Sequence, residues 1–228
     1  MTGFRTTEGA IERRNILIVD DHPVVRRGLV ALIGSDPELA VCGEAGTCDE
    51  AISEVIARSP DLVIVDVALG REDGLSLVRD LKARFPAIPT LVLSMHDEEI
   101  YGERALRAGA SGYVTKQQMD DTVLAAIRQV LRGEIFVSPS LRERRATSRV
   151  EVRAVKDENP LQILTDRELQ VFRRIGEGQV TRRIADELQL SAKTVESHCA
   201  NIKNKLGLRS ATELAHCAIL WIQSGRVR

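Results

Sequence analysis

The sequence DLVIVD, at residues 61–66, is the strongest indication of the fold class in the first half of this chain. Four consecutive apolar residues stand between two aspartates, with no alternation of polar and apolar positions. A continuous apolar run of this length is typical of a strand that is covered on both faces, as in a parallel sheet between helices. Asp66 is therefore expected at the carboxyl end of a buried strand.

Similar apolar runs occur on both sides of this one, and segments with helical periodicity separate them. The runs are ILIVD (16–20), LAVCGEA (39–45), PTLVLS (89–94) and SGYVTK (111–116), and the helices are predicted over 23–34, 48–58, 74–84, 98–108 and 120–132. Asp49 and Asp120 are candidate cap residues, and Gly109 and Gly133 stand where helices should end. Five strand–helix repeats predict right-handed crossovers and an α/β fold with a doubly wound, five-stranded parallel sheet.

Length and charge indicate that a second domain follows. A chain of 228 residues suits two modest domains. Residues 161–228 carry 11 Lys/Arg and 7 Asp/Glu, a net charge of +4, whereas residues 1–160 carry 21 and 26, a net charge of −5. A mildly basic domain attached to an acidic body is compatible with a nucleic-acid partner.

The pattern also predicts the domain boundaries. We expect an N-terminal extension over 1–14, a first domain over 15–137, a linker over 138–160 and a second domain over 161–228. The linker is charge-dense, and a short helix near 141–145 is expected to stay outside any core. The sequence has no apolar stretch long enough to span a membrane, no secretory signal and no C-x-x-C pair. A cytoplasmic protein with reduced thiols is expected.

From Leu161 onward the pattern is helical throughout. TDRE (165–168) is a capping box that opens a first helix through about Ile175, and the segment 176–178 ends this helix. A second helix is predicted over 180–188, a third from Ser191 to about Leu206 and a fourth from 210–213 through Trp221. Apolar residues at helical spacing can enclose one small core. They are Leu169, Phe172, Ile184, Ala185, Leu188, Val195, Ile202 and Leu206.

Polar side chains end most of the predicted strands of the first domain. Asp20 and Asp21 end the first strand, Asp66 the third, Ser94 the fourth and Lys116 the fifth. These groups should converge, because ligands of doubly wound sheets bind beyond the carboxyl ends of the strands. Clustered carboxylates fit a hard cation such as Mg²⁺, beside which one carboxylate can attack a phosphoryl group. Lys116 and Ser94 would then bind phosphoryl oxygens.

With these motifs, residues 15–135 resemble a response-regulator receiver domain. The matching features are the Asp20-Asp21 pair, Asp66 after DLVIV, Gly74, Ser94 after LVL, and GYVTK with Lys116. The resemblance implies a flavodoxin-like fold and phosphorylation of Asp66 by a cognate histidine kinase or a small phosphodonor. It also implies that the backbone carbonyl of Ala68 completes a Mg²⁺ site with the aspartates. Tyr113 matches the family's aromatic switch residue.

Two departures from the receiver pattern concern the acceptor loop. Most of the family has a Met-Pro pair where this chain has Leu69-Gly70, and losing the rigid φ of proline should loosen the loop. Ala68 and His96 occupy positions that tune dephosphorylation in the family. Ala68 offers no polar group to orient a water molecule for attack on the phosphoryl group.

Residues 161–223 resemble the four-helix LuxR-type DNA-binding domain of the NarL/FixJ class of response regulators. The matching string is LTDRELQVFRRIGEGQVTRRIADELQLSAKTVESHCANIKNKLGL, at residues 164–208. The resemblance places the third helix in the major groove, with Glu196, Ser197 and Ala200 at the base edges. For His198, a packing role is an open alternative. The expected DNA contacts are Arg182, Arg183, Lys193, Thr194, Glu196, Ser197, His198, Ala200, Asn201, Lys203 and Lys205.

The fourth helix and the partners complete the prediction. Core packing explains most of this helix's apolar residues, and the resemblance adds dimerisation on DNA through Leu214, Ala218 and Trp221. The expected partners are a histidine kinase, a double-stranded operator, a second copy of the chain and, as a further candidate, RNA polymerase. The chain is not expected to be an enzyme beyond its own phosphoryl transfer and dephosphorylation. Two alternatives are a phosphorylation-independent interaction scaffold and a Mg²⁺-dependent phosphohydrolase that uses Asp66.

Overall fold

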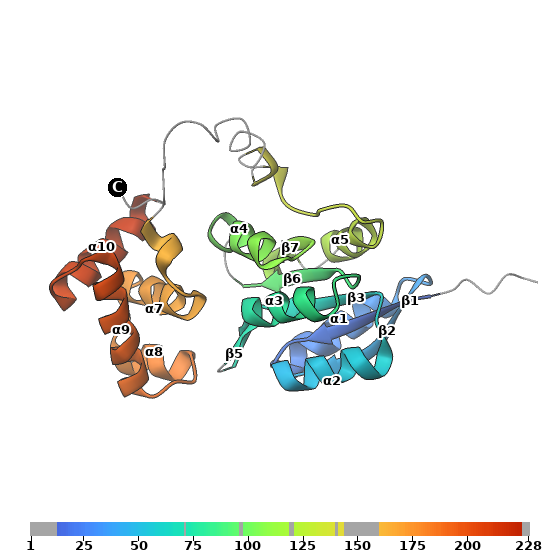
Figure 1. The fold of residues 1–228 in the computed structure, drawn as a ribbon, viewed down its shortest axis with the longest axis horizontal. Helices are drawn as coiled ribbons and strands as arrows, with labels where there is room; N and C mark the ends of the chain where they lie inside the picture. The colour runs from blue at the N-terminus through green and yellow to red at the C-terminus, as the bar shows by residue number, and fades with distance from the viewer. Residues whose placement is uncertain are drawn as a thin grey trace, which may run out of the picture. The chain divides into compact units, whose positions relative to one another are not determined.

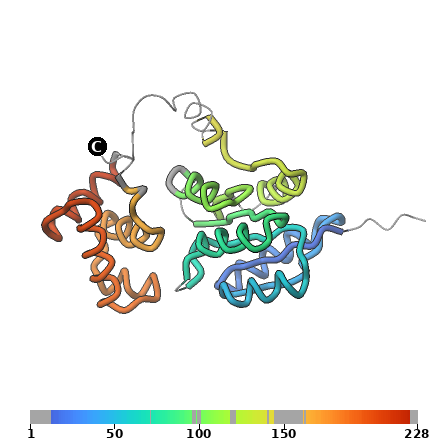
Figure 2. Tube along the Cα trace, in the orientation of Figure 1, coloured from blue at the N-terminus to red at the C-terminus, as the bar shows by residue number. Residues whose placement is uncertain are grey.

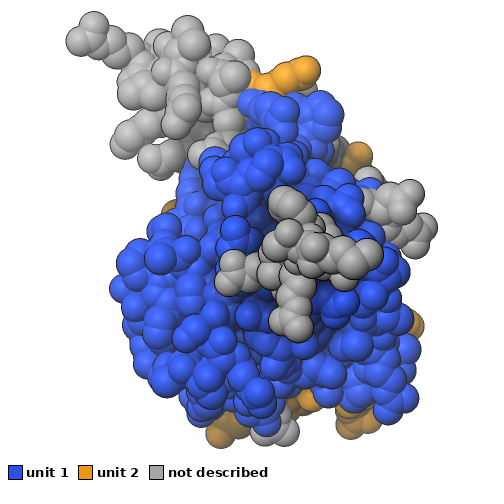
Figure 3. Space-filling view, turned by 90° about the vertical axis from the view of Figure 1, so that its right-hand side faces the viewer, with its two compact units in different colours: residues 1–69, 74–142 blue, residues 70–73, 143–228 orange. Residues whose placement is uncertain are grey.

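The computed structural model describes residues 13–70, 72–95, 98–118, 121–139, 141–143 and 160–224. The chain forms two compact units (Figure 3). One unit comprises residues 1–69 and 74–142, and the other comprises residues 70–73 and 143–228. Figure 2 traces the described chain within each unit. We describe each unit by itself.

The first unit is built on a five-stranded parallel sheet (Figure 1). Its strands are β1 (Arg14–Val19), β2 (Leu39–Ala45), β3 (Leu62–Asp66), β6 (Thr90–Ser94) and β7 (Gly112–Thr115), in the order β2-β1-β3-β6-β7. All neighbouring strands are parallel. Every residue of β3 and β6 is buried, as their continuous apolar runs predict. The predicted α/β fold is confirmed.

Helices cover both faces of this sheet. They are α1 (Pro23–Gly34), α2 (Cys48–Arg58), α3 (Gly74–Arg84), α4 (Glu98–Ala108) and α5 (Asp121–Leu131). Leu29 of α1 and Ile127 of α5 belong to one buried cluster with Ile16 and Ile64 of the sheet. With right-handed crossovers, this strand order places α1 and α5 on that face and α2, α3 and α4 on the other.

Local hydrogen bonds explain where the helices and strands begin. Thr47, rather than Asp49, caps α2, and its side chain accepts a hydrogen bond from the backbone N–H of Glu50. The other candidate cap, Asp120, lies outside the described residues. Arg14 belongs to β1 and not to an extension, because its N–H donates to the Glu38 carbonyl and its guanidinium lies 2.9 Å from Asp61. Gly109 and Gly133 follow helices with positive φ, as expected.

Two features of the chain between Asp66 and Glu143 differ from the sequence prediction. A short two-stranded ribbon of β4 (Ala68–Leu69) and β5 (Glu72–Asp73) follows Asp66. Its strands are too short to leave a periodic signal in the sequence. Leu141, expected in a linker outside any core, is only 2% exposed. The residues beyond Glu143 that were assigned to the linker lie outside the described part of the chain until Pro160.

The second unit is entirely helical among its described residues from 160 to 224. A 3-10 turn, η2 (Pro160–Ile163), precedes α7 (Asp166–Gly176), α8 (Thr181–Glu187), α9 (Ala192–Leu206) and α10 (Ala211–Ser224). Thr165 and Glu168 form the predicted reciprocal capping box. Ser191 caps α9, and Gly207 ends it in the left-handed conformation with φ 67°.

The core of the second unit is close to the predicted set. Phe172 and Trp221 contact each other with ring centroids 5.8 Å apart, and Ile184, Val195 and Ile202 are buried around them. Leu206 is only half-buried. Gly176, predicted to break α7, is its last residue. A Cβ at this position would lie 2.5 Å from the carbonyl oxygen of Ala218, so the glycine lets α10 approach α7 closely.

Candidate functional site

The predicted acidic pocket lies at the carboxyl ends of the strands of the first unit. Asp20 and Asp21 follow β1, Asp66 ends β3, Ser94 ends β6 and Lys116 follows β7. Asp20, Asp66 and Ser94 are almost fully buried. Buried carboxylates at the end of a sheet require a neighbouring cation, because burial of an unpaired charge is costly.

Lys116 supplies that cation. Its Nζ lies 2.6 Å from Oδ2 of Asp20 and 2.7 Å from Oδ2 of Asp66. Burial raises the pKa of Asp66 to about 6; the Lys116 ammonium opposes this rise, and the Asp20 carboxylate adds to it. Burial by itself lowers the pKa of Lys116, but the two carboxylates outweigh it and the pKa is raised. The pair therefore stays ionised at neutral pH, with Asp66 as a carboxylate.

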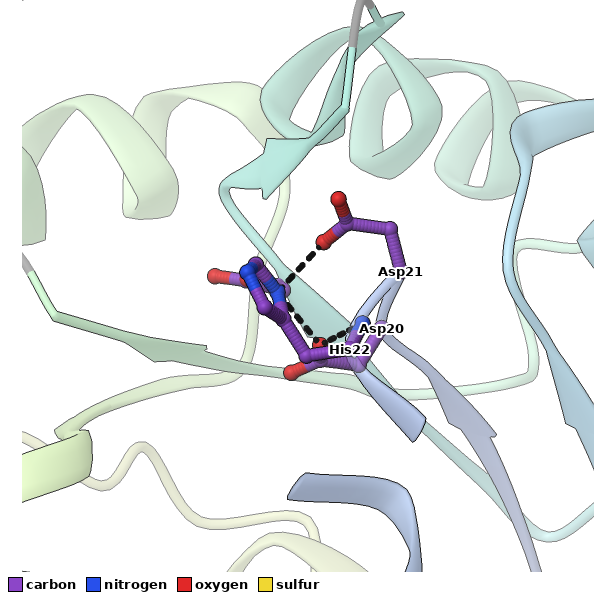
Figure 4. A group of neighbouring side chains, drawn as sticks. Asp20, Asp21 and His22 are labelled. Carbon is purple, nitrogen blue, oxygen red and sulfur yellow. Dashed lines mark hydrogen bonds and ion pairs between the residues drawn. The ribbon is translucent and has the colours of Figure 1, made fainter. Parts of the chain in front are cut away.

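His22 joins the acidic cluster (Figure 4). Its Nδ1 lies 2.7 Å from Oδ1 of Asp21 and 3.3 Å from Oδ1 of Asp20, and its backbone N–H donates to the same Asp20 oxygen at 2.8 Å. Ligand atoms of Asp20, Asp21, His22 and Asp66 all lie within 4.8 Å of one another. The sequence prediction missed His22, although its place directly after the aspartate pair was a signal for it.

The acceptor loop is held in place by its backbone. The N–H of Ala68 donates a hydrogen bond to the Asp66 carboxylate. The N–H of Gly74 donates to the Val67 carbonyl at 2.9 Å. A Cβ on Gly74 would lie 1.9 Å from the carbonyl oxygen of Asp66, so only glycine allows α3 to begin so close to the acceptor.

The chain's departure from the Met-Pro pattern has a structural counterpart. Leu69 is 2% exposed and lies in the β4–β5 ribbon, while Gly70 has a positive φ of 55°. Leu69 is therefore held by burial at this position, and the looser loop expected without proline stays a prediction. His96, the other unusual position, lies outside the described residues.

Ser94 and Tyr113 form the next layer of the pocket. The side chain of Tyr113, on β7, is 1% exposed and shares a hydrogen bond with the Ser94 hydroxyl. Burial raises the pKa of the Tyr113 hydroxyl far above its usual value, and the bond to Ser94 opposes this. The proposed switch residue therefore points inward and touches the hydroxyl at the end of β6.

The second unit presents a polar face on α9. Among the predicted DNA contacts, the exposed residues on this helix are Lys193, Glu196, Ser197, Ala200, Asn201 and Lys205, and Thr194 and Lys203 are half-buried. The Thr194 hydroxyl lies 2.7 Å from that of Ser191. On α8, Arg182 and Arg183 are exposed, and Arg183 pairs with Glu187 at 2.9 Å.

Two predicted contacts are engaged within the unit. The Nζ of Lys205 lies 2.6 Å from Oε2 of Glu168, which ties the end of α9 to the start of α7. His198 is half-buried, and its burial lowers its pKa, with nearby Glu168 opposing the shift and Arg167 adding to it. Both placements favour structural roles for these side chains.

The structure places the predicted dimerisation residues inside the unit. Leu214, Ala218 and Trp221 are all less than 5% exposed, so they belong to the core of the single chain. The exposed apolar residues of α10 are Ile219, Leu220 and Ile222. No helix in the described part of the chain is long and apolar enough to cross a membrane.

Comparison with known proteins gives matches over both units. The family model of the response regulator receiver domain matches residues 16–128, and that of the bacterial regulatory proteins of the luxR family matches residues 162–218. The chain is 38% identical to the DNA-binding transcriptional activator DevR/DosR of Mycobacterium tuberculosis, over 88% of this chain and 91% of that protein. It is 35% identical to the transcriptional regulatory protein UhpA of Salmonella typhimurium, over 88% of this chain and 95% of that protein.

Two solved structures are similar. A LuxR-family two-component response regulator from Aurantimonas sp. SI85-9A1 is 34% identical with a TM-score of 0.56, and the match covers 61% of this chain and 99% of that one. RcsB from Salmonella enterica serovar Typhimurium, bound to promoter rprA in the presence of phosphomimetic BeF3-, is 25% identical with a TM-score of 0.57. That match covers 90% of this chain and 98% of the other.

Proposed function

Because the chain belongs to the two-component response regulators that join a receiver domain to a LuxR-type DNA-binding domain, we propose that phosphorylation of Asp66 controls its binding to DNA. The family regulates transcription and is not a family of enzymes. The observation that carries the proposal is the buried contact of Lys116 with both Asp66 and Asp20. It joins a nucleophile to a cation that can bind the oxygens of an incoming phosphoryl group.

The chemistry follows from the groups in the pocket. An Asp66 carboxylate oxygen attacks the phosphorus atom, and the bond from phosphorus to the nitrogen or oxygen of the donor breaks. Lys116 and the Ser94 hydroxyl are placed to bind the transferred oxygens, and Tyr113 is placed to follow Ser94. A cognate histidine kinase or a small phosphodonor is the expected partner.

Asp20, Asp21 and Asp66, with the backbone carbonyl of Ala68, are the residues that would hold Mg²⁺. Their fit rests on the clustering of the carboxylate oxygens, since a hard cation prefers oxygen ligands. When bound, Mg²⁺ supplies positive charge that offsets repulsion between the carboxylates and the phosphoryl oxygens.

For the second unit we propose a division of roles on DNA. The base edges are read by Glu196, Ser197 and Ala200, which are exposed on α9. The phosphate backbone of the DNA is bound by Lys193, Asn201, Lys203 and Arg182. Lys205 and His198 act mainly by holding α9 on α7. Changing Glu196 to Ala should alter preference at one base pair more than overall affinity; a uniform loss over all sequences would contradict this assignment.

We further propose that active molecules pair through α10. Ile219, Leu220 and Ile222 offer an exposed apolar surface, and a two-fold dimer fits an operator with two half-sites. The DNA complex of RcsB in the presence of BeF3- supports DNA binding by the activated form.

One experiment tests the central proposal. Molecular mass and DNA binding are measured for the full chain with and without Mg²⁺ and beryllofluoride, and with the variant Asp66→Asn. We expect acetyl phosphate to label the wild type but not the variant, and beryllofluoride to strengthen DNA binding of the wild type alone. Stoichiometric labelling of Asp66→Asn would overturn the assignment of the acceptor.

A further inference from the structure

The described residues 134–139 and 141–142 follow α5, and Phe136 pairs with the free edge of β7. The N–H of Phe136 donates to the Ser111 carbonyl at 3.0 Å, and the Phe136 carbonyl accepts from the N–H of Tyr113 at 2.9 Å. Gly112 and Phe136 form a parallel bridge. The segment therefore extends the sheet beyond β7 for a few residues, beside the strand that carries Tyr113.

The same segment then crosses onto α4. The N–H of Ser138 donates to Oε1 of Glu98, in the first turn of α4, at 2.8 Å. The Ser138 hydroxyl accepts from the N–H of Leu141 at 3.2 Å, which closes a turn that points Leu141 at the helix. Two polar contacts thus fix the start of what the sequence presents as a linker.

Leu141 sits in a notch made by Gly102 of α4. Leu141 is 2% exposed, and a Cβ on Gly102 would lie 2.6 Å from its Cδ2. Glycine in the middle of a helix costs about 1 kcal/mol relative to alanine. At this position the missing side chain makes room for Leu141.

Both attachments of this segment, Phe136 on β7 and Ser138 on α4, are made to residues linked to Ser94 of the acidic pocket. Tyr113, whose backbone holds Phe136, shares a hydrogen bond with Ser94. Glu98, which holds Ser138, follows Ser94 by only four positions. A movement of Ser94 toward a phosphoryl oxygen would change its hydrogen bond with Tyr113, whose backbone holds Phe136. A shift of Glu98 away from Ser138 would lengthen the bond between them.

We propose that residues 134–139, with Leu141 and Arg142, form a strap that the receiver holds on β7 and α4, and that phosphorylation loosens. Release of Leu141 from the Gly102 notch adds the strap to the segment that joins the receiver to the DNA-binding unit, which gives that unit the freedom to pair on an operator. This inference rests on the proposed phosphorylation of Asp66.

Three variants separate the strap from general stability. Leu141→Ser removes the apolar anchor. Gly102→Ala fills the notch while raising the helix propensity of α4, so it displaces the strap without weakening the helix. Ile135→Ser is the matched control, because Ile135 lies in the same segment and is 46% exposed.

The experiment is hydrogen–deuterium exchange of the full-length chain, with and without Mg²⁺ and beryllofluoride. In the wild type, beryllofluoride should make the amides of Ser138 and Leu141 exchange about tenfold faster, the size expected for losing one hydrogen bond. Leu141→Ser and Gly102→Ala should exchange fast in both states and bind DNA more tightly than the wild type without beryllofluoride. Ile135→Ser should behave as the wild type.

Fluorine NMR of bound beryllofluoride distinguishes failure of the proposed pocket function from failure of the strap inference. If no bound signal forms in the wild type, the proposed function of the pocket fails. If the signal forms but exchange over 138–142 stays unchanged, the strap inference is overturned while the pocket stands. The inference is also overturned if Leu141→Ser and Gly102→Ala match Ile135→Ser in both exchange and DNA binding.

Discussion

The acidic pocket of the first unit holds three carboxylates, and its chemistry depends on the positive charges that lie next to them. Lys116 contacts Asp20 and Asp66, and among the described residues the imidazole of His22 lies 2.7 Å from Oδ1 of Asp21. Burial makes the ionised form of Asp66 expensive, and this cost appears as a pKa of about 6. The same residue that is placed to react is thus one whose charge destabilises the folded receiver.

This cost gives the first prediction. The folded pKa of Asp66 is about 6, above the value of 3.8 for an unperturbed carboxyl, so the folded state binds more protons than the unfolded state between these values. The free energy of unfolding of the wild type, relative to Asp66→Asn, should therefore fall as pH rises from about 4 to 6, by roughly 2–3 kcal/mol in total. Urea unfolding followed by circular dichroism in metal-free buffer measures it. A pH-independent difference would contradict the prediction.

The second prediction concerns the start of α3. Gly74→Ala should push the acceptor loop away, because its Cβ would lie 1.9 Å from the Asp66 carbonyl oxygen. We expect a loss of about 1–3 kcal/mol in receiver stability, as for other overpacked sites, together with slower labelling by acetyl phosphate. Gly28→Ala is the control, because nothing lies within 4 Å of its Cβ in α1 and it should be neutral or stabilising. Equal labelling rates in the two variants would count against this role of Gly74.

At the scale of elements, the sequence predicted helices and strands well where a long periodic pattern existed. The predicted helices 23–34, 48–58, 74–84 and 98–108 match α1 to α4. The β4–β5 ribbon was missed because each of its strands has two residues. Leu141 was missed because its burial depends on Gly102, which is 39 positions earlier, and no local pattern reports such a contact.

The candidate sites also combine features that a sequence pattern predicts with features that depend on packing between distant residues. Asp20, Asp66, Ser94 and Lys116 converge because strand ends meet at one edge of a parallel sheet, and this could be read from the sequence. The side of α10 that faces the core could not be predicted from the sequence. Leu214, Ala218 and Trp221 are apolar like Ile219, Leu220 and Ile222, and only packing against α7 decides which of them are buried.

The third prediction belongs to the joint between α7 and α9. Burial acts to raise the pKa of Glu168, but hydrogen bonds from Lys205 and Thr165 outweigh it and hold the pKa below its usual value. The stability from this carboxylate is therefore present above its unfolded pKa and lost as pH falls through the lower folded value. Glu168→Gln keeps the capping box but loses the ion pair, and should cost about 1 kcal/mol at neutral pH.

Trp221, the only tryptophan of the chain, reports this change from the core of the second unit. Urea unfolding followed by its fluorescence should show a wild-type advantage at pH 7 that shrinks below about pH 4.5. Glu213→Gln is a control on α10, since Glu213 is exposed and its carboxylate accepts a hydrogen bond from the backbone N–H of Arg209. An advantage that persists unchanged at acid pH would argue against the ion pair as its source.

At the scale of the whole molecule, charge and apolar surface are distributed between the units to suit different partners. The first 160 residues carry a net charge of −5 and the last 68 a net charge of +4. The acidic unit therefore disfavours contact with DNA, while the basic unit gains affinity from phosphates. The proposed pairing of two second units would add the phosphate contacts of two basic surfaces on one operator.

Pairing through α10 gives the last prediction. Leu220→Glu places a charge on a residue that is 47% exposed, so the folded chain should keep the fluorescence of Trp221 and its stability to within about 0.5 kcal/mol. Two copies that bury this surface would instead bury two like charges, which costs several kcal/mol. The beryllofluoride-bound variant should therefore bind an operator with two half-sites no more tightly than a single half-site.

Gln223→Glu, which adds the same charge at another exposed position of α10, shows whether charge alone weakens DNA binding. If Leu220→Glu keeps the wild-type preference for paired half-sites, measured by fluorescence anisotropy at fixed salt, α10 is not the pairing surface.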